Sequence, residues 1–308
     1  AQAHAAIPAI GSAEYNAVRD QIIAGRFQSG GASFYDNSKS TNGEISYKAA
    51  DWLLVGANYR NYGIFTDGTV FNEDPDGDGV NERIHISEWG TYAQVKTDIV
   101  DGLNFTGSLR YDKNENYDGS FTPRIALVYS FGKASNIRAS YQTGFRNPDT
   151  QNQYIFFPTG TVTLLGTAKA NAERYGIMEG GAWSGSSYTA YLNSGGSLDA
   201  SGTPIGGNPA LLQEAYVDYI QPERLKAFEF GYKGIIGDAV LADINYHKTY
   251  YTDMFGGVVV NSKNPATHAG QTLAPGYGWS LGSNANDEVE SWGIGVGLTF
   301  DLGMGYKL

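Results

Sequence analysis

Three aspartates at alternate positions are the residues of this chain best suited to hold a metal ion. Asp74, Asp76 and Asp78 are followed directly by Gly79, the order found in the first half of a calcium-binding loop. A loop of this kind turns alternate carboxylate and carbonyl oxygens toward one hard cation. The segment 72–85 therefore predicts a calcium site, and no other cofactor is expected. Its expected ligands are Asp74, Asp76, Asp78, the Val80 carbonyl and Glu82.

The last ligand position of this loop departs from the usual pattern. A bidentate glutamate normally stands there, whereas this chain has His85, which lowers the expected affinity for calcium. The alternative interpretation is a solvated acidic turn. Neighbouring carboxylates repel one another without a cation, which favours the calcium interpretation. The ion would then stiffen the loop and take no part in bond chemistry.

Residues that could carry out catalysis are sparse. The chain has four histidines, His4, His85, His247 and His268, and none stands at metal-ligand spacing from another. It contains no nucleophile elbow and no phosphate-binding loop. We therefore expect a protein that is not an enzyme. A membrane-embedded barrel hydrolase with scattered catalytic residues stays open as an alternative, and the sequence favours it less than the two non-enzymatic functions given below.

Away from the acidic loop, apolar and polar residues alternate along much of the chain. The odd positions from 103 to 111 are apolar apart from Gly107: Leu103, Phe105, Leu109 and Tyr111. Polar residues fill all the even positions from 104 to 112. A two-residue period predicts a strand with one apolar and one polar face. Segments of about ten such residues, separated by turns, are typical of a transmembrane β-barrel. We predict strands at 42–49, 52–60, 88–98, 103–112, 121–131, 135–142, 226–236, 239–251, 288–300 and 302–308.

The composition is compatible with a barrel and excludes several other classes. The chain has 308 residues, 41 glycines, 22 tyrosines, no cysteine and a net charge of −11. Its mean hydropathy is −0.33, and it contains no uninterrupted apolar run of the ~18 residues that a membrane helix needs. The acidic balance argues against nucleic acid as a partner, because phosphate binding needs clustered lysine and arginine.

The predicted connections alternate between short turns and long loops, as in outer-membrane barrels with periplasmic turns and extracellular loops. We expect residues 1–41 to form a lead-in segment with a short helix capped by Ser12, and residues 42–308 to form a partial barrel. The fold class is all-β, an antiparallel transmembrane β-barrel with long extracellular loops. The long loops are expected at 61–87, 113–120, 143–225 and 252–287.

The loop 143–225 is much longer than an ordinary connection and is rich in aromatic residues. A loop of this kind either covers a pore mouth or contacts a ligand. The simpler interpretation is that the aromatic rings pack against one another and hold the loop together. The candidate substrate-binding residues are Tyr154, Phe156, Phe157, Tyr175, Trp183, Tyr188 and Tyr216.

Charged residues and glycines on the polar faces are expected to line the lumen. Arg110, Arg124, Arg138 and Lys233 fall on polar faces, where pairing with acidic neighbours is the expected role. Three glycines at alternate positions, 293, 295 and 297, share one strand face. Small residues on a lumen face indicate that another group packs closely there.

Two blocks of sequence resemble the barrel of TonB-dependent outer-membrane receptors. The first runs from Pro123 to Tyr129 and from Asn136 to Pro148, where a strand ends in Gly-Phe-Arg-Asn-Pro before a long loop. The second, from Pro222 to Gly234, combines Pro-Glu with a strand that contains Glu-Phe-Gly-Tyr-Lys. The resemblance is good over residues 121–308. It implies a 22-stranded barrel, an N-terminal plug domain and energy coupling through TonB.

About ten of those 22 strands are visible here, and neither a plug domain nor a TonB box is recognisable. We therefore expect the chain to be part of a larger transporter, in which either a signal segment was removed before Ala1 or the N-terminus lies further upstream. The expected function is the barrel portion of an energy-coupled outer-membrane importer. The alternative is a small self-contained outer-membrane pore or structural barrel. Expected partners are outer-membrane lipid, the TonB complex through a plug, and a surface lipoprotein.

The substrate is not identified by any motif. Importers that resemble this chain take siderophores, cobalamin, glycans or peptides. A loop rich in tyrosine and tryptophan with few basic residues suits sugars or peptides better than anionic iron chelates.

Overall fold

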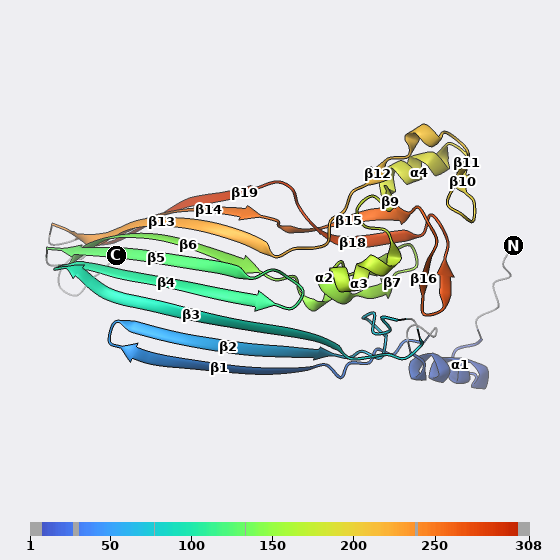
Figure 1. Ribbon diagram of the computed structural model, residues 1–308, viewed down its shortest axis with the longest axis horizontal. Helices are drawn as coiled ribbons and strands as arrows, with labels where there is room; N and C mark the ends of the chain where they lie inside the picture. The colour runs from blue at the N-terminus through green and yellow to red at the C-terminus, as the bar shows by residue number, and fades with distance from the viewer. Residues whose placement is uncertain (1–7, 27–30, 77, 133, 238–239, 301–308) are drawn as a thin grey trace.

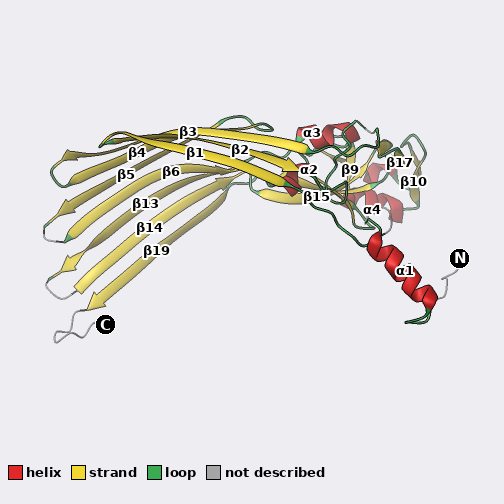
Figure 2. Cartoon of the chain, turned by 90° about the horizontal axis from the view of Figure 1, so that it is seen from below, coloured by secondary structure: helices red, strands yellow, loops and turns green. Residues whose placement is uncertain are grey.

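The main body of the protein is a curved antiparallel sheet of nine strands (Figures 1 and 2). The computed structural model describes residues 8–26, 31–76, 78–132, 134–237 and 240–300. The sheet is open in this part of the chain, with β1 at one edge and β19 at the other. In spatial order its strands are β1 (Lys39–Ala50), β2 (Leu53–Ile64), β3 (Ile84–Val100), β4 (Leu103–Asn114), β5 (Ser120–Phe131), β6 (Ser135–Arg146), β13 (Glu223–Ile236), β14 (Val240–Thr252) and β19 (Val289–Phe300).

The two faces of the main sheet differ in chemistry, because side chains alternate along each strand. On the apolar face, large hydrophobic side chains remain exposed, as Trp292, Ile294 and Val296 of β19 do with exposed fractions of 60%, 64% and 63%. The same face carries Ile45 of β1 and Phe230 of β13. Exposed apolar side chains on one face of a sheet are what a barrel presents to lipid. The apolar face predicted for residues 288–300 is confirmed by the exposed side chains of β19.

The polar face carries ion pairs and close-packed glycines. Asp243 of β14 accepts from Arg138 at 2.9 Å and lies 3.4 Å from Lys233 Nζ, so two of the predicted lumen-lining bases are paired. Gly293 and Gly295 lie opposite the imidazole of His247 and the amide of Asn245. A side chain at either glycine would collide with its cross-strand partner. The glycines therefore make room for the neighbouring strand's polar groups.

Short turns lie at one end of the sheet and long connections at the other, as predicted. We call these the turn end and the loop end. Three of the four loops are shorter than expected, because the strands beside them extend beyond their predicted limits: β3 begins at Ile84, and only five residues separate β4 from β5. The fourth, 253–288, has its expected length. The predicted strand 302–308 lies outside the described residues.

The two longest connections, 147–222 and 253–288, fold together at the loop end into one body, which we call the loop lobe. Its six-stranded sheet contains β12 (Glu214–Ala215), β9 (Ala182–Ser184), β15 (Phe255–Ser262), β18 (Gly278–Asn284), β8 (Thr163–Leu165) and β7 (Phe156–Pro158), in that order. Its core surrounds Trp279, which is fully buried. The expected extended loops are therefore a packed unit with its own hydrophobic core.

Several short elements complete the loop lobe. The helices are α2 (Thr150–Tyr154), α3 (Lys169–Ala172) and α4 (Gly185–Asn193), with 3-10 turns η2 (Glu173–Tyr175) and η3 (Pro209–Leu211). Two hairpins consist of β10 (Gly196–Leu198) with β11 (Pro204–Gly206), and β16 (Ala266–His268) with β17 (Gln271–Leu273).

The N-terminal segment forms one helix, α1 (Ala13–Ala24), at the loop end (Figure 1). The Ser12 hydroxyl accepts from the Tyr15 amide at 3.1 Å and caps the helix, as the sequence suggests. The apolar residues Val18, Ile22 and Ile23 share a face but remain exposed, and none of the helix residues is buried. The strand that follows begins at Lys39, inside the expected lead-in segment. No described helix is long and apolar enough to cross a membrane.

Candidate functional site

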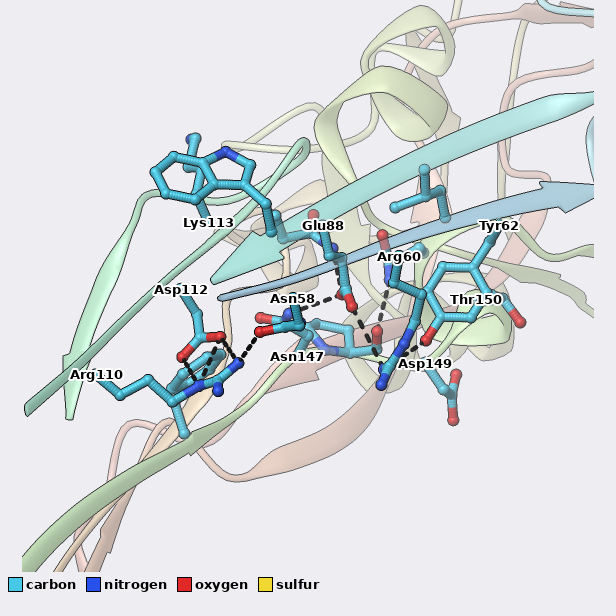
Figure 3. A pocket seen from close by; sticks show the side chains of 16 residues that line it. Asn58, Arg60, Tyr62, Glu88, Arg110, Asp112, Lys113, Asn147, Asp149 and Thr150 are labelled. Carbon is cyan, nitrogen blue, oxygen red and sulfur yellow. Dashed lines mark hydrogen bonds and ion pairs between the residues drawn. The ribbon is translucent and has the colours of Figure 1, made fainter. Parts of the chain in front are cut away.

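A polar cavity lies at the loop end of the polar face, between the main sheet and helix α2 (Figure 3). We call it the upper cavity, and its volume is about 470 Å³. Strands β2, β3 and β4 form its floor, and the segment 145–153 forms its roof. Its lining residues are Asn58, Arg60, Tyr62, Ile86, Glu88, Trp89, Arg110, Asp112, Lys113, Asn114, Phe145, Asn147, Pro148, Asp149, Thr150 and Gln153.

One hydrogen-bonded cluster in the upper cavity is centred on Glu88. Arg60 lies opposite Glu88 on the neighbouring strand, with its guanidinium 3.7 Å from the Glu88 carboxylate. The same guanidinium donates to the Tyr62 hydroxyl at 3.0 Å. The Glu88 carboxylate also accepts from the amides of Asn114 and Asn147, at 2.7 and 3.1 Å. Because Asn147 follows the end of β6, this carboxylate joins the roof of the cavity to its floor (Figure 3).

A second cluster holds the guanidinium of Arg110. Its Nε donates to both carboxylate oxygens of Asp112, at 2.9 and 2.7 Å, and its Nη2 donates to Asp112 and to Asn58 at 2.5 and 2.6 Å. Such a bidentate pair fixes the guanidinium in one orientation. The intervening Gly90 is essential to it, because a Cβ there would lie within 3 Å of all three side chains.

The roof of the upper cavity is held by helix α2 and its contacts. The Asp149 carboxylate accepts from the Asn152 amide at 2.7 Å and caps the helix. Within the helix, Gln153 accepts from the side chain of Asn116 at 2.7 Å. Asn116 in turn accepts from the Tyr154 hydroxyl at 3.1 Å. These bonds attach the roof to the short connection between β4 and β5.

The chemistry of the upper cavity is suited to binding. Its lining contains three basic and three acidic side chains, and four amide side chains, but no histidine, serine or cysteine. A group of this kind offers many hydrogen-bond donors and acceptors to a ligand.

The aromatic residues predicted to bind substrate lie mostly inside the loop lobe. Four are buried, with exposed fractions of 9% or less: Tyr154, Phe156, Tyr175 and Tyr188. Phe157 and Trp183 are half-buried, and Tyr216 is 77% exposed. The buried rings occupy the self-packing role that was the simpler interpretation. Substrate binding by the loop aromatics stays a prediction, and Tyr216 is the member most accessible to a ligand.

Three connections meet at a buried junction of polar and aromatic groups. Asn72 donates to the Tyr175 hydroxyl at 2.8 Å, and this hydroxyl lies 3.0 Å from Nδ1 of His268. The imidazole stacks on Phe156 with a centroid distance of 3.4 Å. Burial, aided by the nearby positive charge of Arg174, lowers the pKa of His268 to about 4, and burial raises the pKa of Tyr175. Both groups are therefore uncharged near neutral pH.

The acidic loop brings its three aspartates together. One carboxylate oxygen from each of Asp74, Asp76 and Asp78 lies within 4.8 Å of the others. The Asp74 and Asp78 carboxylates accept from the amides of Gly79 and Val80, at 3.1 and 2.8 Å, so the loop curls around them. The structure does not bring Glu82 into this group of acidic oxygens. His85 pairs with Gly63 within the β2–β3 ladder, away from the turn.

Apart from Arg110, the residues of the upper cavity are not among the sites predicted from the sequence. A signal is present, since Asn58 and Arg60 on one strand and Glu88 on the next are polar residues on the polar face of the sheet. The roof residues Asn147 and Gln153 carried no such signal. Their position depends on how the long loop folds back onto the sheet.

Comparison with known proteins gives one family match that covers nearly the whole chain. The family model described as "TonB dependent receptor-like, beta-barrel" matches residues 7–308. Among curated proteins, the vitamin B12 transporter BtuB of Vibrio cholerae is 36% identical over 89 residues. This match covers 28% of the chain and 14% of the transporter.

Solved structures show a similar fold. A mutant form of the ferric enterobactin receptor PfeA from Pseudomonas aeruginosa matches with a TM-score of 0.53 and 14% identity. The match covers 88% of this chain and 34% of the receptor chain. Another mutant of the same receptor, in complex with enterobactin, matches with a TM-score of 0.52 and 12% identity. The chain thus spans about a third of these receptors.

Proposed function

This chain belongs to the TonB-dependent receptor β-barrel family, and from that premise we propose that it forms the wall and loops of an energy-coupled outer-membrane importer. Proteins of this family, such as the vitamin B12 transporter, are located in the outer membrane and serve nutrient transport. The proposal adds a binding step at the loop end, a plug within the lumen, and coupling to TonB through that plug.

The observation that carries this proposal is the polar cavity at the loop end of a two-faced sheet. The apolar face is suited to lipid, so the polar face turns toward the lumen. The upper cavity then lies just inside the extracellular mouth, beneath the loop lobe. A substrate held in the upper cavity by the amides and charged groups of the lining is positioned to pass down the polar face. Tyr216, the exposed loop aromatic, would contact the substrate before it enters the cavity.

Uptake by whole cells tests the proposal. Cells with and without the full-length protein are given radiolabelled cyanocobalamin or radiolabelled ferric enterobactin, with TonB intact or deleted. We expect accumulation of one substrate to require both the protein and TonB. Protein-dependent accumulation that persists without TonB contradicts the proposal and favours a self-contained passive pore. A variant with Asn147→Ala should lower uptake without lowering the amount of protein in the outer membrane.

We also propose that the acidic loop binds calcium through Asp74, Asp76 and Asp78, with the Val80 carbonyl and Glu82 as further ligands. The clustered carboxylates and the curled backbone support this assignment. Calcium should protect the loop from limited proteolysis in the full-length protein, and EGTA should remove that protection. Asp76→Asn should weaken the effect, and Asp101→Asn at the turn end is the matched control. Equal cleavage with calcium and with EGTA contradicts the proposal.

A further inference from the structure

We propose that the ligand of the upper cavity is an uncharged amphiphile, with hydrogen-bonding groups in the upper cavity and an apolar edge in a neighbouring aromatic cavity. The inference rests on the proposed function, because it assigns a chemical class to the substrate of the same site. Three properties of the polar face carry it: the presence of the second cavity, the pairing of the charges, and the number of amide groups.

The second cavity adjoins the upper cavity on the side of β1. It has a volume of about 660 Å³ and shares Tyr62 and Thr150 with the upper cavity. We call it the aromatic cavity, because apolar side chains form much of its wall. Its apolar and aromatic members are Phe34, Tyr35, Tyr62, Ile64, Val70 and Phe71. Both cavities border helix α2, so one ligand can occupy both sides of Tyr62.

The ring of Phe34 is the part of the aromatic cavity that a ligand can reach most directly. Phe34 is 54% exposed, and its ring centroid lies 6.0 Å from that of Phe157, one of the loop aromatics predicted to bind substrate. The two ionic residues that line this cavity, Asp36 and Lys39, have opposite charges. An apolar ring or edge of a ligand could therefore stack here without meeting an excess of either charge.

The basic groups of the upper cavity are already bound to protein oxygens. Arg110 is held by Asp112, Arg60 by Tyr62 and Glu88, and the Lys113 ammonium donates to the Tyr117 carbonyl at 2.5 Å. An anionic ligand at Arg110 would have to displace the Asp112 carboxylate and remain beside the displaced charge. At Arg60 an anion would lie close to the Glu88 carboxylate, which is 3.7 Å from the guanidinium. Both guanidinium sites therefore disfavour anions.

The groups that remain to recognise a ligand are mainly amides. Four amide side chains line the cavity, and each has two donor hydrogens and two acceptor sites. Asn114 and Gln153 are buried, and each is already hydrogen-bonded through both its nitrogen and its oxygen. Asn58 and Asn147 keep capacity for a ligand, because the hydrogen bonds within the protein engage the oxygen of Asn58 and one donor of Asn147. Such groups match hydroxyls or amides of an uncharged ligand.

Equilibrium binding to the purified full-length protein tests the inference. The probes without net charge are cyanocobalamin and p-nitrophenyl maltopentaoside. Cyanocobalamin carries amides and an apolar benzimidazole, and its phosphodiester charge is balanced at the cobalt centre. The maltopentaoside carries hydroxyls and an apolar ring. The anionic probe is ferric enterobactin. We expect one uncharged probe to bind at least about tenfold more tightly than ferric enterobactin. Which probe binds distinguishes a corrinoid from a sugar as the source of this chemistry.

Three variants and one control make the test specific to the cavities. Asp112→Asn releases Arg110 and should raise the affinity for ferric enterobactin about tenfold, whereas Asp101→Asn at the turn end should not change it. Phe34→Ala should weaken binding of p-nitrophenyl maltopentaoside or cyanocobalamin, but not of maltopentaose, which lacks the apolar ring. A second variant, Phe71→Leu, keeps the aromatic cavity filled and should have the smaller effect.

The possible failures are distinguishable. If wild-type protein binds ferric enterobactin more tightly than both uncharged probes, and Asn147→Ala abolishes that binding, the inference is overturned and the proposed function stands. If Phe34→Ala changes the affinities of maltopentaose and its p-nitrophenyl derivative equally, the apolar part of the inference is overturned. If uptake in cells is independent of TonB, the proposed function itself fails.

Discussion

The orientation of β5 in the membrane gives the sharpest test of the fold. Ile125 lies on the apolar face with an exposed fraction of 45%, midway between the outward-facing rings of Phe121 and Tyr129. The two rings are eight positions apart in the sequence, so at a rise of ~3.3 Å and a tilt of ~45° they are about 19 Å apart across the bilayer. Ile125 therefore lies near the middle of the lipid core.

Replacing Ile125 by arginine should destabilise the folded protein by about 2–4 kcal/mol, the cost of placing that side chain at the bilayer midplane. Ala126→Arg is the matched control, because the adjacent residue has the same depth and faces the lumen, where Arg124 already lies. Its expected cost is below about 1 kcal/mol. The free energies come from urea titrations of the full-length protein in phospholipid vesicles, followed by tryptophan fluorescence. Equal losses in both variants, or a greater loss for Ala126→Arg, would refute the assignment of the two faces.

Three further predictions concern the loop lobe. Trp279→Ala should lower its local stability by about 3–5 kcal/mol because it removes a fully buried ring, measured by hydrogen exchange, whereas Trp292→Ala on the apolar face should leave exchange in the lobe unchanged. Lowering the pH from 7.5 to 5 should destabilise the junction at His268 by about 2 kcal/mol. The pKa of His268 in the folded state lies below the unfolded value of 6.5, so the unfolded state binds more protons as the pH falls from 6.5 toward 4. His268→Phe should remove that dependence in hydrogen exchange corrected for intrinsic rates. Gly166→Ala should cost about 1–3 kcal/mol, because its Cβ would collide with the backbone of α2, and Gly256→Ala, with no atom nearer than 3.9 Å, should be neutral by thermal unfolding.

The strands of the main sheet could be predicted because their signal is local. Alternation along one strand depends only on which medium each face contacts, so β4 and β19 are readable residue by residue. Strand ends were less predictable. β3 continues to Ile84 because β2 remains beside it as far as Ile64, and this pairing lies outside the pattern of either segment.

The loop lobe could not be predicted, because its sheet joins segments that are distant in sequence. β18 pairs with β8, so that Trp279 lies opposite Thr163. A local cue was available in the run Val258-Val259-Val260, which favours a strand inside a supposed loop. The candidate site shares this difficulty. Its floor follows from alternation, whereas its roof depends on where the chain after β6 folds back.

The shared sheet of the loop lobe also constrains how the mouth of the barrel can move. The connection after β14 contributes the two central strands of one sheet, β15 and β18, and the connection after β6 contributes the two strands on either side of them. Both connections are anchored in the main sheet at each end. Neither can swing away as an independent flap without breaking backbone pairing with the other. Opening therefore requires the lobe to tilt as one body, and during synthesis it can assemble only after β14 and β18 have been made.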